Sequence, residues 1–308
     1  MHILPKSSNN GIIFSMYLIS SYFELLRPKQ WLKNIFVIAP VVFSFSFFDL
    51  EKIILSLFAF LIFCAASSAV YVFNDAIDAP RDRLHPLKRN RPVARGDTSV
   101  SAAWFFSILL SLIALAAGFA VSPGFFWTVF AYLLLNICYT FWLKRAFLLD
   151  MFSVALGFVL RIMAGVAAIG VHLAPWSLGA TFFLALFIVA IKRLQEIKIA
   201  SSPSFYTLEF LRSVIFVSLI LTLAIFIFYA MLDVKSIPFL ITVLPVLYGM
   251  FRFLWLAEVK GTLSDNPTDI IFQDFPMQAS VVIFVLLVIS IFTLRLTSYA
   301  SILFSISQ

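Results

Sequence analysis

Long apolar stretches follow one another along almost the whole chain, and they limit its fold more than any other feature. A transmembrane helix needs about 20 predominantly apolar residues. Hydrophobic residues make up 62% of the chain and charged residues 12%, which lies beyond the apolar share of an ordinary soluble domain. The sequence therefore predicts an all-α polytopic membrane bundle of about nine helices, at residues 34–50, 53–73, 99–121, 124–143, 148–170, 174–191, 213–232, 237–257 and 277–301.

The segment before the first expected span mixes polar and apolar positions. It reads "GIIFSMYLISSYFELLRPKQW" and ends in charge and Trp31. This pattern is typical of a helix that lies in the membrane interface, although a tenth span is the alternative. We expect residues 1–308 to form a single integral-membrane domain, with residues 1–32 as an interfacial lead-in.

The basic residues are distributed unevenly between the two sides of the expected membrane. If the amino terminus lies in the cytoplasm, the far side receives only Lys52, Lys235 and Arg295. Positive residues concentrate in cytoplasmic loops, so the polar loops at 74–98, 192–212 and 258–276 should face the cytoplasm. The formal charge of +7 then sets the orientation in a cell inner (plasma) membrane, and we expect no nucleic-acid partner.

The loop after the second expected span, "NDAIDAPRDRLHPLKRNRP" at 74–92, carries a group of carboxylates. Asp75, Asp78 and Asp82 would share one helix face within about 60° of arc. Such close carboxylates repel one another, and Mg²⁺ binds carboxylates together with substrate phosphates. Asn74 adds a neutral oxygen, and we expect Pro80 to kink or end the helix.

Basic residues follow these carboxylates directly. They place cationic donors beside the expected metal, as a diphosphate leaving group requires. The alternative is a solvated loop whose charges only set the topology. The donors in question are His85, Lys88, Arg89, Arg91 and Arg95.

A second group of polar residues lies at the end of the fourth expected span, in "YTFWLKRAFLLD". Tyr139, Lys144 and Asp150 flank this end, and Arg161 lies about 16 Å deeper on the helix of Asp150. A charge at that depth indicates function, with a structural ion pair as the alternative. Lys192 can form an ordinary i, i+4 ion pair with Glu196 on one helix.

The stretch "NDAIDAPRD" fits the NDxxDxxxD motif of the UbiA superfamily of intramembrane prenyltransferases, which this chain resembles over almost its entire length. The resemblance implies nine helices around a central cavity open to the cytoplasm. It also implies two Asp-rich loops that hold Mg²⁺ on a diphosphate, and transfer of a carbon centre to an acceptor.

The second motif departs from the common form of that superfamily. Ordinary members carry DxxxD, whereas "DMFSV" here keeps Asp150 and has Val154 in the second position. Other segments are similar to the decaprenyl-phosphate phosphoribosyltransferase branch, namely "RPKQWLKN", "LKRAFLLD", "GFVLR", "KR" at 192 and "NPTDIIFQDFP". That branch implies transfer from phosphoribosyl pyrophosphate to a polyprenyl phosphate among the membrane lipids, with release of diphosphate, and a product that feeds a lipid-linked arabinose donor.

The resemblance and the residue patterns together define the expected site. Catalytic roles fall to Asp75, Asp78, Asp82 and Asp150, of which the first three also hold the metal. An aromatic prenyltransferase that uses a polyprenyl diphosphate remains an alternative, and so does a carrier or channel that binds a cation. The expected substrate-binding residues are Lys29, Lys33, Asn34, Asn74, His85, Lys88, Arg91, Tyr139, Lys144, Arg161, Lys192 and Arg193.

Overall fold

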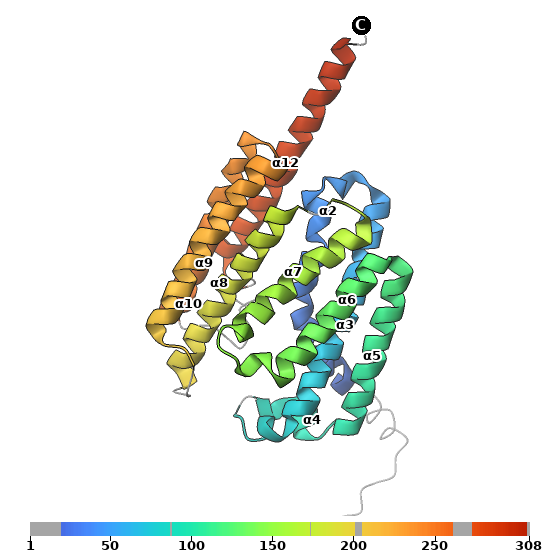
Figure 1. The fold of residues 1–308 in the computed structure, drawn as a ribbon, viewed down its shortest axis with the longest axis vertical. Coiled ribbons are helices and arrows are strands. Elements are labelled where there is room, and N and C mark those ends of the chain that lie inside the picture. The colour runs from blue at the N-terminus through green and yellow to red at the C-terminus, as the bar shows by residue number, and fades with distance from the viewer. Residues whose placement is uncertain (1–19, 87, 173, 201–204, 261–272, 307–308) are drawn as a thin grey trace, which may run out of the picture.

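The computed structural model describes residues 20–86, 88–172, 174–200, 205–260 and 273–306, and these residues form helices without a strand (Figure 1). Residues 1–19 of the expected lead-in and residues 266–272 of "NPTDIIFQDFP" lie outside this range. The elements of the described residues are η1 (Pro28–Val37), α2 (Ala39–Phe43), η2 (Ser46–Phe48), α3 (Leu50–Asp82), η3 (Lys88–Asn90), α4 (Pro92–Arg95), α5 (Val100–Val121), α6 (Pro123–Phe141), η4 (Leu143–Arg145), α7 (Leu149–Ile169), α8 (Pro175–Ala200), α9 (Leu208–Phe228), η5 (Tyr229–Asp233), η6 (Ile237–Thr242), α10 (Val243–Lys260) and α12 (Phe275–Ile306).

Side-chain caps define where several long helices begin. Asp49 accepts from the third residue of α3, while Ser99, Ser122 and Thr207 cap α5, α6 and α9 in the same way. Such caps satisfy backbone N–H groups that have no partner inside the helix. Between these caps the sequence is apolar, so each helix can cross a bilayer.

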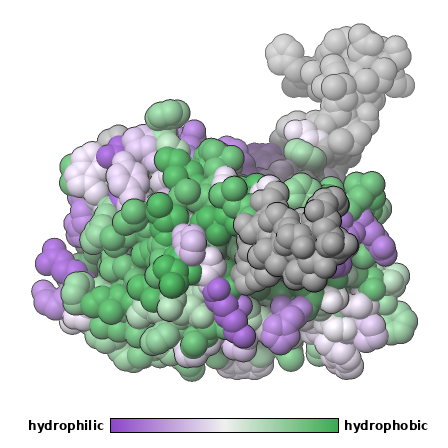
Figure 2. Space-filling view, turned by 90° about the horizontal axis from the view of Figure 1, so that it is seen from above, coloured by the Kyte–Doolittle hydropathy of each residue, from purple (hydrophilic) through white to green (hydrophobic). Residues whose placement is uncertain are grey.

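Eight helices among the described residues have the length and hydropathy of membrane spans. Each of them overlaps one of the spans expected from residue 53 onward, which confirms a multi-pass membrane protein. In α5 the large side chains on the outer face are exposed, as lipid contact requires. They are Phe105, Ile108, Leu112 and Phe119. Figure 2 shows the same preference from above, where hydrophobic side chains cover much of the surface.

The expected first span at 34–50 is wrong as a single helix. The segment instead forms η1, α2 and η2 in succession. Pro40 contributes no backbone N–H, and Phe45 has a φ of 64°, which ends the helical path. Irregular backbone at membrane depth is tolerated where protein covers it, and η1 packs against both α3 and α7.

Gly165 allows the broken segment to approach α7 closely. A Cβ atom on this glycine would stand 2.1 Å from the carbonyl oxygen of Val37 and 2.9 Å from Pro40 Cγ. No side chain fits in that space. The contact therefore fixes the height of η1 against α7.

The helices form two groups that meet at α7 and α8 (Figure 1). One group contains α3, α5, α6 and α7, and its core includes Phe63 and Phe125. The other contains α8, α9, α10 and α12, and α8 packs with α7, α9 and α10 around Phe187 and Leu194. The end of α3, the start of α7 and the lower end of α8 all lie toward the bottom of Figure 1.

Candidate active site

Helix α3 carries all three predicted metal ligands, because it continues through Pro80 and ends at Asp82. The helix therefore ends two residues after Pro80 and not at the proline itself. The proline lies in the last turn, where the loss of one backbone N–H disturbs only the end of the helix. The i, i+3, i+7 spacing consequently applies to the whole set.

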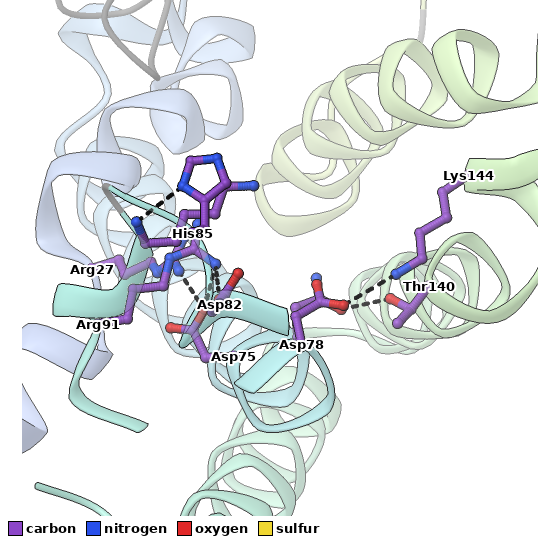
Figure 3. A network of polar contacts seen from close by, with 10 residues as sticks. Arg27, Asp75, Asp78, Asp82, His85, Arg91, Thr140 and Lys144 are labelled. Atoms are coloured by element: carbon purple, nitrogen blue, oxygen red, sulfur yellow. Dashed lines mark hydrogen bonds and ion pairs between the residues drawn. The ribbon is translucent and has the colours of Figure 1, made fainter. Parts of the chain in front are cut away.

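Two arginines neutralise the carboxylates of Asp75 and Asp82 (Figure 3). The Nη1 atom of Arg91 lies 2.6 Å from Asp82 Oδ2 and 3.2 Å from Asp75 Oδ1. Arg27, in the left-handed conformation before η1, pairs with Asp75 as well. We refer to these residues, with Asp78 and Lys144, as the first cluster.

One buried oxygen in the first cluster is left without a partner. Asp75 is 2% exposed, and its Oδ2 atom accepts no hydrogen bond from the described residues. A buried, unsatisfied carboxylate oxygen costs free energy and so marks a place where a ligand can bind. Hard oxygen donors of this kind suit Mg²⁺. This oxygen therefore has the chemistry of a divalent-cation ligand.

Asp78 points away from the other two carboxylates, toward α6 and η4 (Figure 3). Lys144 Nζ lies 3.5 Å from Asp78 Oδ1, and Thr140 donates to Asn74 Oδ1 at 2.6 Å. Within the described part of the chain, no three acidic, histidine or cysteine side chains converge as a ready metal site. Asp75 and Asp82 share Arg91, whereas Asp78 pairs with Lys144, so the three carboxylates of the predicted triad do not converge.

The other expected residues of this region are less enclosed. His85 is exposed and accepts the backbone N–H of Lys88 on Nδ1 at 3.3 Å. Lys29 is exposed, and Lys33 and Lys88 are half-buried. All lie in or beside the elements that carry the first cluster.

A second cluster consists of Tyr139, Asp150, Arg193, Glu196 and Tyr206. Asp150 is 5% exposed and accepts from Arg193 Nε at 3.0 Å and from the Tyr206 hydroxyl. The other two nitrogens of Arg193 reach Glu196 Oε2 at 2.6 Å and the Tyr139 hydroxyl at 3.4 Å. Asp150 thus orients a cation, and a direct role on the substrate stays a prediction.

The Tyr206 hydroxyl is held as a donor toward Asp150. Burial and this hydrogen bond raise the pKa of Tyr206 above its ordinary value. The hydroxyl also accepts the backbone N–H of Leu148 at 2.8 Å. It therefore remains protonated at physiological pH and ties the start of α7 to the segment before α9.

The end of α6 joins the two clusters. Thr140 contacts Asn74 on α3, whereas the adjacent Tyr139 contacts Arg193 on α8. Lys144, four residues further, pairs with Asp78. Lys192 lies beside the second cluster and pairs with Glu196 at 3.7 Å, as the i, i+4 spacing predicts. The structure thus brings most predicted polar residues to one end of the bundle.

Arg161 and Asn34 lie elsewhere, inside the bundle. Arg161 donates to Asn34 Oδ1 at 2.9 Å, to the Gly157 carbonyl at 2.9 Å and to the Tyr132 hydroxyl at 3.0 Å. Aromatic rings, including Phe63 at 5.5 Å, surround its guanidinium group. These neutral partners form no ion pair, and they join α7 to η1 and α6.

Sequence reasoning missed three residues with contacts in the two clusters: Arg27, Thr140 and Tyr206. Arg27 stood in the segment "RPKQWLKN" without a role of its own, although its position before Pro28 places it at a turn. Tyr206 has no local signal, because 56 residues separate it from its partner Asp150. Only the packed fold brings those two together.

A sequence model described as the UbiA prenyltransferase family matches residues 35–267, which is most of the chain. The chain belongs to this family. Its NDxxDxxxD motif is the end of α3, and its second motif is the start of α7, where Asp150 holds Arg193. The sequence resemblance to the family is confirmed.

Relatives and solved structures agree with this membership. The decaprenyl-phosphate phosphoribosyltransferase of Corynebacterium glutamicum is 35% identical over 68% of this chain and 64% of its own length. The enzyme of the same name from Mycolicibacterium smegmatis is 29% identical over 85% of this chain and 89% of its own. A UbiA homolog from Archaeoglobus fulgidus, solved bound to DMAPP and Mg²⁺, shares the fold with a TM-score of 0.69 at 20% identity, covering 89% of this chain and 99% of that one.

Proposed function

We propose that this protein transfers 5-phosphoribose from phosphoribosyl pyrophosphate to a polyprenyl phosphate and releases diphosphate. The observation that carries the proposal is the pair of polar clusters joined by the end of α6. The donor has anionic groups at two ends of one sugar, a diphosphate on C1 and a phosphate on C5. Two separate cationic clusters can hold both ends at once, whereas a prenyl diphosphate has a single anionic end.

The first cluster binds the diphosphate in this proposal. Asp75, Asp78 and Asp82 would hold Mg²⁺, which neutralises the negative charge that collects on the departing diphosphate. The unpaired Oδ2 atom of Asp75 supports this assignment. Arg27 and Arg91 lie against the same carboxylates and can turn to phosphate oxygens once a metal is present.

The second cluster binds the 5-phosphate through Arg193. Two further cations are available, namely Lys192 beside this cluster and Lys144 of the first cluster, which follows the end of α6. The acceptor phosphate is ionised at neutral pH, so its oxygen can attack C1 without a strong general base. One C–O bond forms at C1 as the bond to diphosphate breaks. The absence of the second Asp, at Val154, is then tolerable, because a cation site replaces a second metal site.

The membrane supplies the acceptor and sets the side of the reaction. The basic loops support an inner-membrane protein whose two clusters face the cytoplasm, where a soluble sugar donor is accessible. The polyprenyl chain stays among the lipid-facing helices. The product would feed a lipid-linked arabinose donor, as the sequence resemblance to the decaprenyl-phosphate phosphoribosyltransferase branch implies.

A labelled-donor assay tests the proposal. Purified protein with radiolabelled phosphoribosyl pyrophosphate, polyprenyl phosphate and Mg²⁺ should yield a labelled lipid. Folded protein that yields none would contradict it. Conversion of labelled prenyl diphosphate with a phenolic acceptor would favour an aromatic prenyltransferase instead, and cation flux in liposomes without a product would favour a carrier.

A further inference from the structure

Tyr206 connects the segment before α9 to the start of α7 through one hydroxyl group. Its side chain comes from the segment just before α9 and is 8% exposed. The hydroxyl accepts the Leu148 N–H at 2.8 Å and donates to Asp150 on α7. Its ring packs against those of Phe147, at 5.3 Å, and Phe210, at 5.8 Å. The ring therefore packs independently of what the hydroxyl does.

The backbone that receives this hydroxyl is strained. Leu148 has a φ of 63° and a ψ of −32°, an unfavourable combination for a leucine. Such strain persists only where surrounding contacts stabilise it, and it is concentrated at functional sites. The hydrogen bond from Leu148 to Tyr206 is one of those contacts. It fixes the start of α7 two residues before Asp150.

Asp150 links Tyr206 to Arg193, because its carboxylate contacts both side chains. The carboxylate receives Tyr206 on one oxygen and Arg193 Nε on the other. Tyr139 receives a second nitrogen of the guanidinium group. The third nitrogen reaches Glu196, whose side chain is 43% exposed and can therefore leave. Asp150 and Tyr139 thus fix the plane of the guanidinium group. The edge that contacts Glu196 can exchange this partner for another anion.

We propose that Tyr206 is a positioning residue for the donor, and that it acts through Asp150 to aim the exchangeable edge of Arg193 at the phosphate on C5 of the sugar. Glu196 occupies this edge until the phosphate displaces it. This inference rests on the proposed function, since it assigns the same second cluster to one group of the donor. Arginine geometry matters here, because a planar guanidinium group binds phosphate well only when its edge is correctly oriented.

Tyr206→Phe tests the inference, because it removes the hydroxyl and keeps the packed ring. We expect the KM for phosphoribosyl pyrophosphate to rise about 10-fold while kcat changes by less than about 3-fold, as loss of donor binding alone predicts. Tyr229→Phe is the matched control, since Tyr229 is also buried but packs in the distant cluster around Phe239. The control should keep the wild-type KM.

A double-mutant cycle separates positioning from general stability. If Tyr206 acts through Arg193, then Tyr206→Phe should raise the donor KM by less than about 2-fold in an Arg193→Lys background, because the shared route is already broken. Full additivity would overturn the inference. So would a wild-type KM in Tyr206→Phe, or a loss equal to that of the Tyr229→Phe control.

The failure of the proposed function gives a different result. Wild-type protein would then form no labelled lipid, and it would not bind phosphoribosyl pyrophosphate in calorimetry. If the wild-type protein is active and Tyr206→Phe has the wild-type KM for the donor, the inference fails and the proposed function stands.

Discussion

The two polar clusters use carboxylates in opposite ways. In the first, Asp75 shares one oxygen between two arginines and leaves the other buried without a partner among the described residues. In the second, both oxygens of Asp150 are satisfied by Arg193 and Tyr206. Unsatisfied buried oxygens favour a metal, whereas satisfied ones only orient their partner. This difference is the basis for proposing a metal in the first cluster and a phosphate-binding cation in the second.

The contrast also explains how the second motif can lose a carboxylate. A second metal site would need two acidic residues at the start of α7, and this chain has Asp150 and Val154 there. One carboxylate is enough to hold an arginine. A preset arginine can bind a phosphate without any metal.

The largest expected effect is at Asp75. Asp75→Asn keeps the shape but removes the charge that a metal requires, so kcat/KM should fall by about 1000-fold or more. Activity assays at saturating Mg²⁺ measure this. Asp49→Asn at the opposite end of α3 is the control and should retain wild-type turnover. Comparable activity in both variants would remove the basis for a metal in the first cluster.

The second largest effect concerns η1, which directly follows Arg27. Gly165→Ala would force the Val37 carbonyl away from α7 and should destabilise the protein by about 2 kcal/mol. Thermal unfolding in detergent measures the loss. Gly179→Ala is the control, because its Cβ would meet only the Ile225 side chain, at 3.2 Å. Equal stability of the two variants would show that η1 is free to shift.

One of the features behind these two predictions could be predicted from the sequence, and the other could not. The spacing of the carboxylates and the apolar length of α3 predicted that Asp75, Asp78 and Asp82 lie at the end of one long helix, since both are local properties of that helix. The break at 34–50 was missed, because overall hydropathy outweighed Pro40 and the close contact at Gly165 is a tertiary property. The hydrogen bond of Tyr206 to Asp150 depends on packing between distant helices and could not be read from the sequence.

Asp150→Asn sharpens the comparison between the clusters. An amide still accepts from Arg193 but attracts it less, so the donor KM should rise about 10-fold with kcat largely retained. Steady-state kinetics with varied phosphoribosyl pyrophosphate separate the two parameters. A collapse of kcat like that of Asp75→Asn would instead assign Asp150 to the metal or the reacting atoms.

The smallest effect is expected at Glu196. Glu196→Gln removes the charge that competes for Arg193, and the donor KM should fall by about 3-fold because exposed ion pairs are weak. The same kinetic assay detects it. Glu209→Gln, at the start of α9, is the matched control and should leave the KM unchanged. A higher KM in Glu196→Gln would mean that Glu196 assists binding.

Calorimetric titration of phosphoribosyl pyrophosphate with and without Mg²⁺, in the wild type and in Asp75→Asn, tests the metal assignment most directly. Mg²⁺ should raise the donor affinity of the wild type by about 10-fold or more and leave that of the variant nearly unchanged. An equal dependence on Mg²⁺ in both proteins would contradict a metal held by Asp75.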